Sequence, residues 1–247
     1  MFNTTKALVL RQVRYKEADR ILTLFTESEG KLTARARGAL RKNSKLAAAT
    51  QQLCYAEMTL FGNRGRWTVN EASVVEPFLP LQSDIASFSL GCYFAECLEA
   101  FSVEEQADPA LLQLGLNSLY GLGSPRFDPL LVKAAFELRL MCLSGYAPSV
   151  DACAVCGKET PQEPCLSIEN GCVFCRDCRR TDMGQSQYLG EDALAALRYI
   201  VSAPPRQLLS FSLEGEGRTR LGEAAERYLL AHAERKFSTL EYWKSVR

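Results

Sequence analysis

The sequence predicts an α+β protein: an N-terminal five-stranded OB-fold barrel followed by an α-helical bundle domain with an inserted four-cysteine zinc knuckle. Three observations lead to this prediction. The first eighty residues alternate apolar and polar positions over short runs, later residues repeat apolar positions at a helical period, and six of the ten cysteines gather in one segment. We therefore expect one domain over residues 1–80 and another over residues 81–247, with the zinc-binding insertion at residues 149–182.

Five runs in the first domain are rich in Leu, Val, Ile, Thr and aromatic residues, a composition typical of β-strands. Turn signals at Glu29-Gly30 and at residues 62–65 join the second run to the third, and the fourth to the fifth, as hairpins. The connection between the third and fourth runs is long enough for a loop plus a short helix. This arrangement follows the order of an OB barrel, with an SH3-like barrel as the alternative. The predicted strands are Lys6–Tyr15, Arg20–Ser28, Lys31–Gly38, Cys54–Asn63 and Arg66–Val75.

The period of the apolar residues changes after Pro80. Residues 85, 88, 92, 95 and 98 form one apolar stripe, and Ser83 or Asp84 is placed to cap the helix that carries it. Two later segments begin with Asp-Pro, the preferred pairing of N-cap and first helical residue. These signals predict helices over residues 83–106, 108–123, 128–145, 190–203 and 217–246.

Two C-x-x-C pairs organise the segment between residues 151 and 182. Cys153 and Cys156 form the first pair, Cys175 and Cys178 form the second, and eighteen residues separate them. This spacing is typical of a zinc knuckle, in which each pair turns two thiolates toward one tetrahedral Zn²⁺ at roughly 2.3 Å. Four sulfurs leave no coordination position for water or substrate. We therefore predict one structural zinc ion that stabilises a long irregular excursion.

Other interpretations of these cysteines exist. A disulfide pair would need an oxidising compartment, and a redox-active C-x-x-C is expected beside a βαβ unit and needs no second copy. Cys172, Cys175 and Cys178 also follow one another at three-residue spacing, so the ligand set can be argued. We choose the pair that repeats the x-x spacing at the end of the segment, which leaves Cys165 and Cys172 as spare thiols.

The overall composition, 47% apolar and 23% charged, is ordinary for a soluble globular protein. No amino-terminal segment has the pattern of a signal peptide, and the uncharged run Ile85–Ala95 is too short to span a bilayer. We therefore expect a cytoplasmic protein with reduced thiols and no membrane partner.

The charge is zero overall but unevenly distributed. Residues 1–80 contain 13 Lys and Arg against 7 Asp and Glu, whereas residues 81–247 contain 16 against 22. This asymmetry suggests that the first domain meets a polyanion and the second meets proteins. Six cations between Gly30 and Ala56 have no acid among them, and Arg64 and Arg66 flank the next hairpin. The candidate phosphate-binding residues are Lys31, Arg35, Arg37, Arg41, Lys42, Lys45, Arg64 and Arg66.

The alternative for these cations is an ordinary solvated surface. Tyr15, Phe25, Phe61 and Trp67 are candidates for stacking on bases, although each of them is more often a core residue. Catalytic patterns are not evident, since there is one histidine, His232, and no P-loop or dinucleotide-binding glycine motif. We expect no enzymatic activity.

Taken in order, these motifs resemble those of the bacterial recombination mediator family RecO. The likeness begins with a Glu-x-Asp-Arg turn at residues 17–20 that leads into ILTLFT. A Gly-Lys hairpin follows, and then a basic segment that ends in the pattern L-x-x-x-x-Q at residues 46–51. It continues through the cysteine pairs to a closing helix matched by Tyr228 to Ser245. Two departures are Arg37-Gly38, where Lys-Gly is common, and Cys172, which replaces the second of two glycines.

The resemblance implies a DNA-binding mediator in homologous-recombination repair that makes and breaks no bonds. Such proteins bind single- and double-stranded DNA and anneal complementary strands. With RecR they help load RecA onto DNA coated by the single-stranded-DNA-binding protein (SSB), whose C-terminal tail they contact. A cytoplasmic, nucleoid-associated location follows. The alternatives are an RNA-associated protein with an OB barrel and zinc knuckle, or a zinc-dependent nucleic-acid enzyme.

Overall fold

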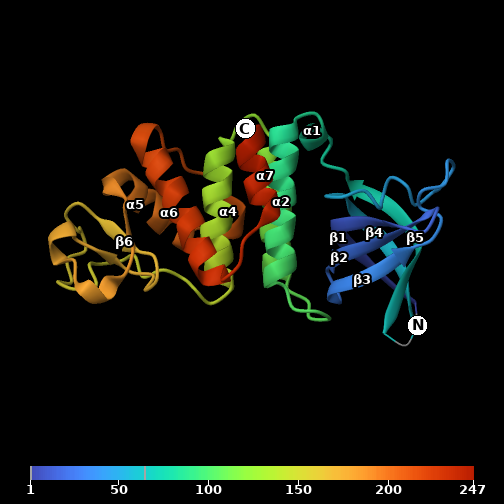
Figure 1. Ribbon diagram of the computed structural model, residues 1–247, viewed down its shortest axis with the longest axis horizontal. Coiled ribbons are helices and arrows are strands. Elements are labelled where there is room, and N and C mark those ends of the chain that lie inside the picture. Colours follow the sequence, from blue (N-terminus) through green and yellow to red (C-terminus); the bar gives the residue numbers. More distant parts are fainter. Residues whose placement is uncertain (1, 64) are drawn as a thin grey trace. The chain divides into compact units, whose positions relative to one another are not determined.

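Five strands form an amino-terminal barrel in the computed structural model, which describes residues 2–63 and 65–247 (Figure 1). The barrel is closed, with the strand order β1-β2-β3-β5-β4. Its neighbouring pairs are antiparallel except β3 and β5, which are parallel. This order confirms the predicted OB-type barrel. The strands are β1 (Phe2–Tyr15), β2 (Asp19–Thr26), β3 (Gly30–Ala36), β4 (Tyr55–Asn63) and β5 (Arg66–Glu76).

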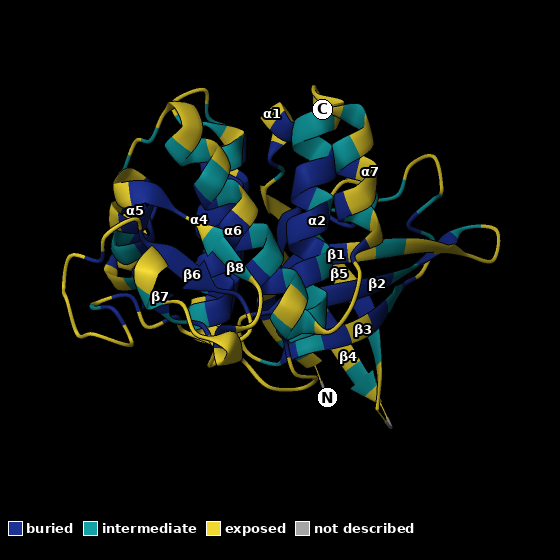
Figure 2. Cartoon of the chain, turned by 60° about the vertical axis from the view of Figure 1, so that its left-hand side comes forward, coloured by how far each residue is buried: buried dark blue, intermediate teal, exposed yellow. Residues whose placement is uncertain are grey.

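The inside of the barrel is filled by apolar side chains from alternate strand positions. Along β3, Leu32, Ala34 and Ala36 are buried, while Thr33 is exposed and Arg35 is half-buried. The alternation is visible as dark and light bands on the strands in Figure 2. Because successive side chains of a strand point to opposite faces, Arg35 lies on the outer surface, as the sequence pattern predicts.

The connection between β3 and β4 forms successive turns. The short helix expected there does not form in residues 37–54. Arg20 anchors this connection to β2, because its Nη1 donates to the carbonyl of Ala47 at 3.0 Å and to the hydroxyl of Thr50 at 2.8 Å.

Aspartate caps begin the three main helices that follow the barrel. Asp84 accepts from the N–H groups of Ala86 and Ser87, Asp108 from that of Leu111, and Asp128 from that of Leu130. The predicted helix starts are therefore correct, and the helical region is confirmed. The helices are α1 (Leu79–Gln82), α2 (Ile85–Phe101), α3 (Pro109–Leu122), α4 (Pro129–Leu143), α5 (Gly190–Ser202), α6 (Gly215–Ala233) and α7 (Ser238–Val246).

The predicted single helix over residues 217–246 is wrong, because α6 ends at Ala233 and α7 begins at Ser238. Glu234 adopts a left-handed conformation with φ of 50°, which terminates α6. Phe237 is almost fully buried and packs edge-on against Tyr93, with ring centroids 5.7 Å apart. Burial of this ring fixes the point at which the chain turns.

The chain divides into two compact units. The barrel, α1, α2, α3 and α7 belong to one unit, and α4, α5 and α6 belong to the other together with the cysteine-rich segment. The expected domain boundary at residues 80 and 81 stays a prediction, since compactness alone does not define an independently folding domain. No helix in the described residues combines the length and apolar character needed to cross a membrane.

The cysteine-rich segment, residues 149–188, forms a small lobe between α4 and α5. Its sheet has the order β7-β6-β8, from β6 (Cys165–Ser167), β7 (Val173–Phe174) and β8 (Ser186–Tyr188). Gly171 makes the turn between β6 and β7 with φ of +61°. A Cβ atom at this position would also collide with the Tyr228 hydroxyl, so glycine is required there. Two short 3₁₀ turns, Arg176–Cys178 and Thr181–Met183, lie in the lobe, and a third, Pro205–Gln207, follows α5.

Candidate metal centre and nucleic-acid groove

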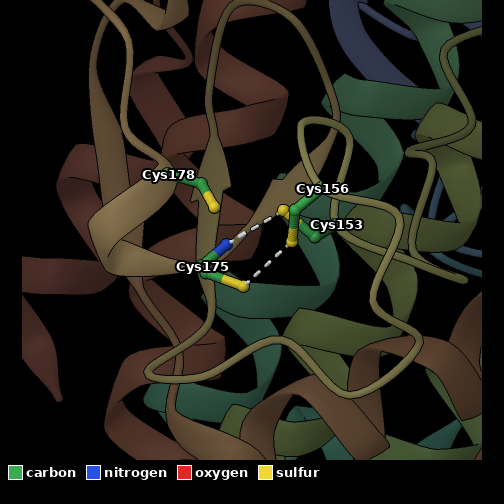
Figure 3. A group of neighbouring side chains, drawn as sticks. All are labelled: Cys153, Cys156, Cys175 and Cys178. Atoms are coloured by element: carbon green, nitrogen blue, oxygen red, sulfur yellow. Dashed lines mark hydrogen bonds between the residues drawn. The ribbon is translucent and has the colours of Figure 1, made fainter.

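Four thiols converge in the cysteine lobe. The Sγ atoms of Cys153, Cys156, Cys175 and Cys178 all lie within 4.8 Å of one another, and their side chains point toward a common centre (Figure 3). The Sγ atoms of Cys156 and Cys175 are 3.8 Å apart. These are the four residues that the C-x-x-C spacing selects, and the lobe brings all of them together.

Each C-x-x-C pair is shaped by a local turn. Gly157 donates its N–H to the carbonyl of Cys153 at 2.9 Å, and Cys178 donates to the carbonyl of Cys175 at the same distance. Each turn therefore places the second cysteine of the pair over the first. Arg198 of α5 fixes the segment around the first pair, because its guanidinium donates to the carbonyls of Val150 and Asp151 at 2.7 Å and of Glu159 at 2.6 Å.

The protonation of these thiols depends strongly on their neighbours. Burial raises the pKa of Cys153, but N–H groups of Cys156, Cys175 and Val155 outweigh it and lower this pKa to about 6. Cys178 behaves oppositely, since hydrogen bonding to Cys156 raises its pKa to about 12. Thiolates packed this closely cannot all ionise without a cation between them. The donor set therefore fits a soft metal ion that takes four sulfurs.

The two spare thiols of the segment lie outside this group. Cys165 is buried in the small apolar cluster beside the group, with Phe174 and Met183. Cys172 is half-buried at the turn before β7, where its carbonyl accepts from the N–H of Ser167 at 2.9 Å. Neither belongs to the set of mutually close metal-ligand atoms found among the described residues.

A groove of about 1080 Å³ runs over the outer surface of the barrel. Arg35, Arg37 and Arg66 line it together with the aromatic residues Tyr15 and Trp67. None of the described residues that line this groove is acidic. The groove thus combines positive charge with aromatic surface, a combination suited to an extended polyanion that carries flat rings.

A second, smaller cavity of about 430 Å³ is lined by Arg35, Arg37, Gly38 and Arg41 around one carboxylate, that of Asp19. Asp19 accepts from Nε of Arg35 at 2.8 Å and from the backbone N–H of Gly38 at 2.7 Å. The hydrogen bond from Gly38 has the larger effect and that from Arg35 the next, and both lower the pKa of Asp19 below its ordinary value. Part of the charge of Arg35 is therefore neutralised within the protein, whereas Arg37 and Arg41 are exposed.

The remaining predicted phosphate-binding residues are distributed differently. Lys31 donates its Nζ to the carbonyl of Glu99 at 2.9 Å, within the last turn of α2, and is half-buried. Lys42 and Lys45 are exposed on the connection between β3 and β4 but line neither cavity. Arg64 lies outside the described residues. The structure thus gathers Arg35, Arg37, Arg41 and Arg66 and gives Lys31 a helix-capping position.

The four aromatic candidates also separate. Phe25 is fully buried and can only be a core residue, whereas Tyr15 and Phe61 are 41% and 37% exposed and line the groove. Trp67 is half-buried, packs against the barrel core and also lines the groove. Phe2 lines it as well, although the sequence pattern does not single it out, because that pattern predicts a first strand that begins only at Lys6.

The Glu-x-Asp-Arg turn has a structural role that sequence reasoning missed. Asp19 binds the start of the β3–β4 connection through Gly38, and the neighbouring Arg20 binds its later part through Ala47 and Thr50. Arg20 is itself 9% exposed. Two adjacent residues thus hold both ends of the exposed basic segment. The sequence gives no local signal of this role, because Arg35, which binds Asp19, lies sixteen residues away along the chain.

Comparison with known proteins gives a consistent result over the whole chain. Residues 1–78 match the family model described as Recombination protein O N terminal, and residues 82–241 match Recombination protein O C terminal. A DNA repair protein RecO from Acetivibrio thermocellus is 34% identical over 98% of this chain and 96% of its own length. Those from Symbiobacterium thermophilum and Clostridium novyi are each 33% identical, over 97% and 85% of this chain and 96% and 82% of their own lengths.

Proposed function

The chain belongs to the recombination protein O family, and on that premise we propose that it is a non-catalytic mediator of recombinational DNA repair. The protein binds single- and double-stranded DNA and anneals complementary strands. With RecR it helps to load RecA onto DNA coated by SSB. The observation that supports this proposal best is the barrel groove, where the described lining residues include three arginines and aromatic side chains but no acidic residue.

The DNA-binding surface of this proposal consists of the exposed cations on and beside the groove. Arg37, Arg41 and Arg66 are exposed, so each can contact a phosphate without first breaking a buried interaction. The positive charge of Arg35 is partly compensated, because its Nε and Nη2 both donate to the carboxylate of Asp19. Lys42 and Lys45 extend the surface along the β3–β4 connection. Contacts of this kind release counterions from DNA and do not depend on base sequence.

Annealing follows from charge screening. Two complementary strands repel each other through their phosphates, and a cationic surface lowers this repulsion while the base edges stay free to pair. The chemistry requires no covalent step, so no catalytic group and no nucleotide are needed.

In the same proposal the four thiols hold one Zn²⁺ ion. The ion supplies a tetrahedral cross-link when bound, and Cys153, Cys156, Cys175 and Cys178 would be its ligands. With four protein sulfurs, no coordination position remains for water or substrate. The role of the ion is therefore the stability of the lobe.

Protein partners would bind the acidic remainder of the chain. Residues 81–247 carry 22 acidic and 16 basic residues, a balance that favours protein contacts over DNA contacts. RecR and the C-terminal tail of SSB are the partners we propose, with RecA reached indirectly. A location in the bacterial cytoplasm at the nucleoid follows from these partners.

The proposal is tested by annealing two complementary oligonucleotides, one of them coated with its cognate SSB, in the absence of ATP. We expect the protein to accelerate annealing and a variant with Arg35, Arg37, Arg41 and Lys42 replaced by Ala to lose the effect. The same variant should bind DNA of every sequence more weakly, with the salt slope reduced by roughly 0.7–0.9 per lost contact.

Lys31→Ala is the control for Arg37→Ala, because each variant removes one positive charge from the barrel. Because Lys31 caps a helix, its loss should leave the salt slope of DNA binding unchanged, whereas Arg37→Ala should reduce it. A wild-type protein that fails to accelerate annealing would refute the proposed function. A four-residue variant with an unchanged slope would remove these residues from the DNA-binding surface.

A further inference from the structure

Two phenylalanines contact each other on the outer surface of the barrel. Phe2 of β1 and Phe61 of β4 are direct register partners, with ring centroids 5.0 Å apart. Phe2 is 62% exposed and Phe61 is 37% exposed. A single exposed apolar residue is ordinary in soluble proteins, but two aromatic rings in contact form an apolar patch that requires an explanation.

The pair belongs to the basic groove. A row of register partners leads from Arg35 of β3 to Thr68 of β5 and on to Phe61, and all of them line the groove. Directly paired residues project on the same face of a sheet, and neighbouring strands lie about 4.8 Å apart. Phe61 therefore lies roughly 10 Å along the sheet from Arg35. The aromatic ring of Phe61 and the positive charge of Arg35 thus lie two strands apart on the same face of the sheet.

We propose that Phe2 and Phe61 form a stacking platform for an unpaired base, so that the groove binds single strands in preference to duplex DNA. This inference rests on the proposed function and adds a basis for strand selectivity to it. In a duplex the faces of the bases are covered by their neighbours, so only an unpaired or splayed base can lie on the rings. Phosphate contacts alone would give the groove no such selectivity.

The composition of the groove favours nucleic acid over a protein as the occupant. Arg35, Arg37 and Arg66 line it, while none of its described lining residues is Asp or Glu. An apolar protein surface would gain nothing from three cations, whereas a polyanion with flat rings uses both features. Tyr15, which lies under the guanidinium of Arg35 at 5.2 Å from its ring centroid, extends the aromatic lining.

The test uses the full chain and three DNA probes of equal length: oligodeoxythymidylate, the same strand with abasic sites replacing most bases, and a blunt duplex. Phe61→Ala should weaken binding of oligodeoxythymidylate about tenfold, as expected for the loss of one stacked base. Binding of the abasic strand and the duplex should change little, and the salt slope should stay the same because no cation is removed. Phe2→Ala should act in the same direction.

Two variants serve as controls. Phe61→Trp keeps a stacking surface and should retain the affinity for oligodeoxythymidylate. Tyr120→Ala removes an aromatic residue that is 67% exposed on α3, away from the groove lining, and should leave all three affinities unchanged. Thermal unfolding of each variant checks that the barrel remains folded.

Each outcome separates the inference from the proposed function. A wild-type protein that binds none of the probes overturns both. If the wild type binds DNA but Phe61→Ala has no effect, or weakens all three probes equally, only the stacking platform is overturned. Selective loss on oligodeoxythymidylate, restored in Phe61→Trp, supports it.

Discussion

The barrel and the cysteine lobe are stabilised in different ways. The barrel has strands of 7 to 14 residues closed into a ring around a core of apolar side chains such as Leu22, Leu24 and Leu60. The strands of the lobe have two or three residues, and its own apolar cluster consists of Phe174 and Met183 beside buried cysteines. The barrel buries a larger core of its own, whereas we expect the lobe, with its short strands, to depend on a cross-link between the four thiols.

This difference separates the two candidate functions within one chain. The groove depends on side chains displayed by the closed barrel, whereas the four converging thiols lie in the small lobe and are suited to cross-linking it through a metal ion. If the four thiols bind a metal as proposed, its loss should affect the lobe first and the barrel groove last.

The largest expected effect is that of metal removal. Structural zinc contributes on the order of 10 kcal/mol to the folding of small zinc-dependent domains, so a chelator or Cys153→Ser should unfold the lobe. Hydrogen exchange measured across the chain should show lost protection in residues 149–188 and retained protection in β1–β5.

Cys172→Ser is the matched control for this prediction, because Cys172 lies in the same lobe but outside the group of four thiols. The Cys172→Ser protein should bind one zinc ion, and its residues 149–188 should keep their protection from hydrogen exchange. A lobe that remains equally protected with and without chelator would contradict the view that it needs a cross-link.

A core substitution in the barrel should have the next largest effect. Leu24 is fully buried, and Leu24→Ala should reduce the free energy of unfolding by about 2–5 kcal/mol through lost burial and the cavity left behind. Zinc content, measured by atomic absorption, should not change while denaturant unfolding shifts to lower concentration. If Leu24→Ala lost bound zinc at the same denaturant concentration at which its barrel unfolds, the two regions would not fold separately.

The smallest effect concerns the pH dependence of the barrel surface. The folded protein holds the pKa of Asp19 below its ordinary 3.8 through Gly38 and Arg35, so ionised Asp19 stabilises the fold above pH 3.8. This contribution is lost as the pH falls below 3.8 through the lowered folded pKa. The stability difference between wild type and Asp19→Asn should therefore shrink over that acidic range.

Because the four thiols proposed to bind zinc would also protonate in acid, the comparison between the two proteins is the relevant measurement, and any loss of metal common to both cancels. Urea titrations at a series of pH values would provide it. A difference that stays constant from neutral to strongly acidic pH would show that Asp19 does not titrate differently in the folded state.

Short-range signals in the sequence predicted much of this structure. Asp108 and Asp128 cap the helices that follow them because a cap involves only the next two or three residues. The members of each cysteine pair approach each other for a similar reason, since each C-x-x-C closes one turn. The alternation along β3 placed Arg35 on the outer surface of the barrel.

Features that depend on distant parts of the chain could not be predicted. Lys31 has the spacing of a surface cation, yet its ammonium binds the carbonyl of Glu99 on a helix that follows much later. Phe2 becomes part of the groove only because β1 pairs with β4 as far as Phe61. The break at Glu234 likewise depends on the burial of Phe237 against Tyr93, which no local propensity encodes.

The position of α7 bears on how the protein is made. Phe237–Arg247 belongs to the same compact unit as the barrel, and Thr239 donates its N–H to Glu96 of α2 at 3.1 Å. A ribosome therefore synthesises the entire second unit before the last helix of the first one emerges. Until then the side of α2 that receives α7 lacks its cover, and truncated chains would expose it to chaperones and proteases.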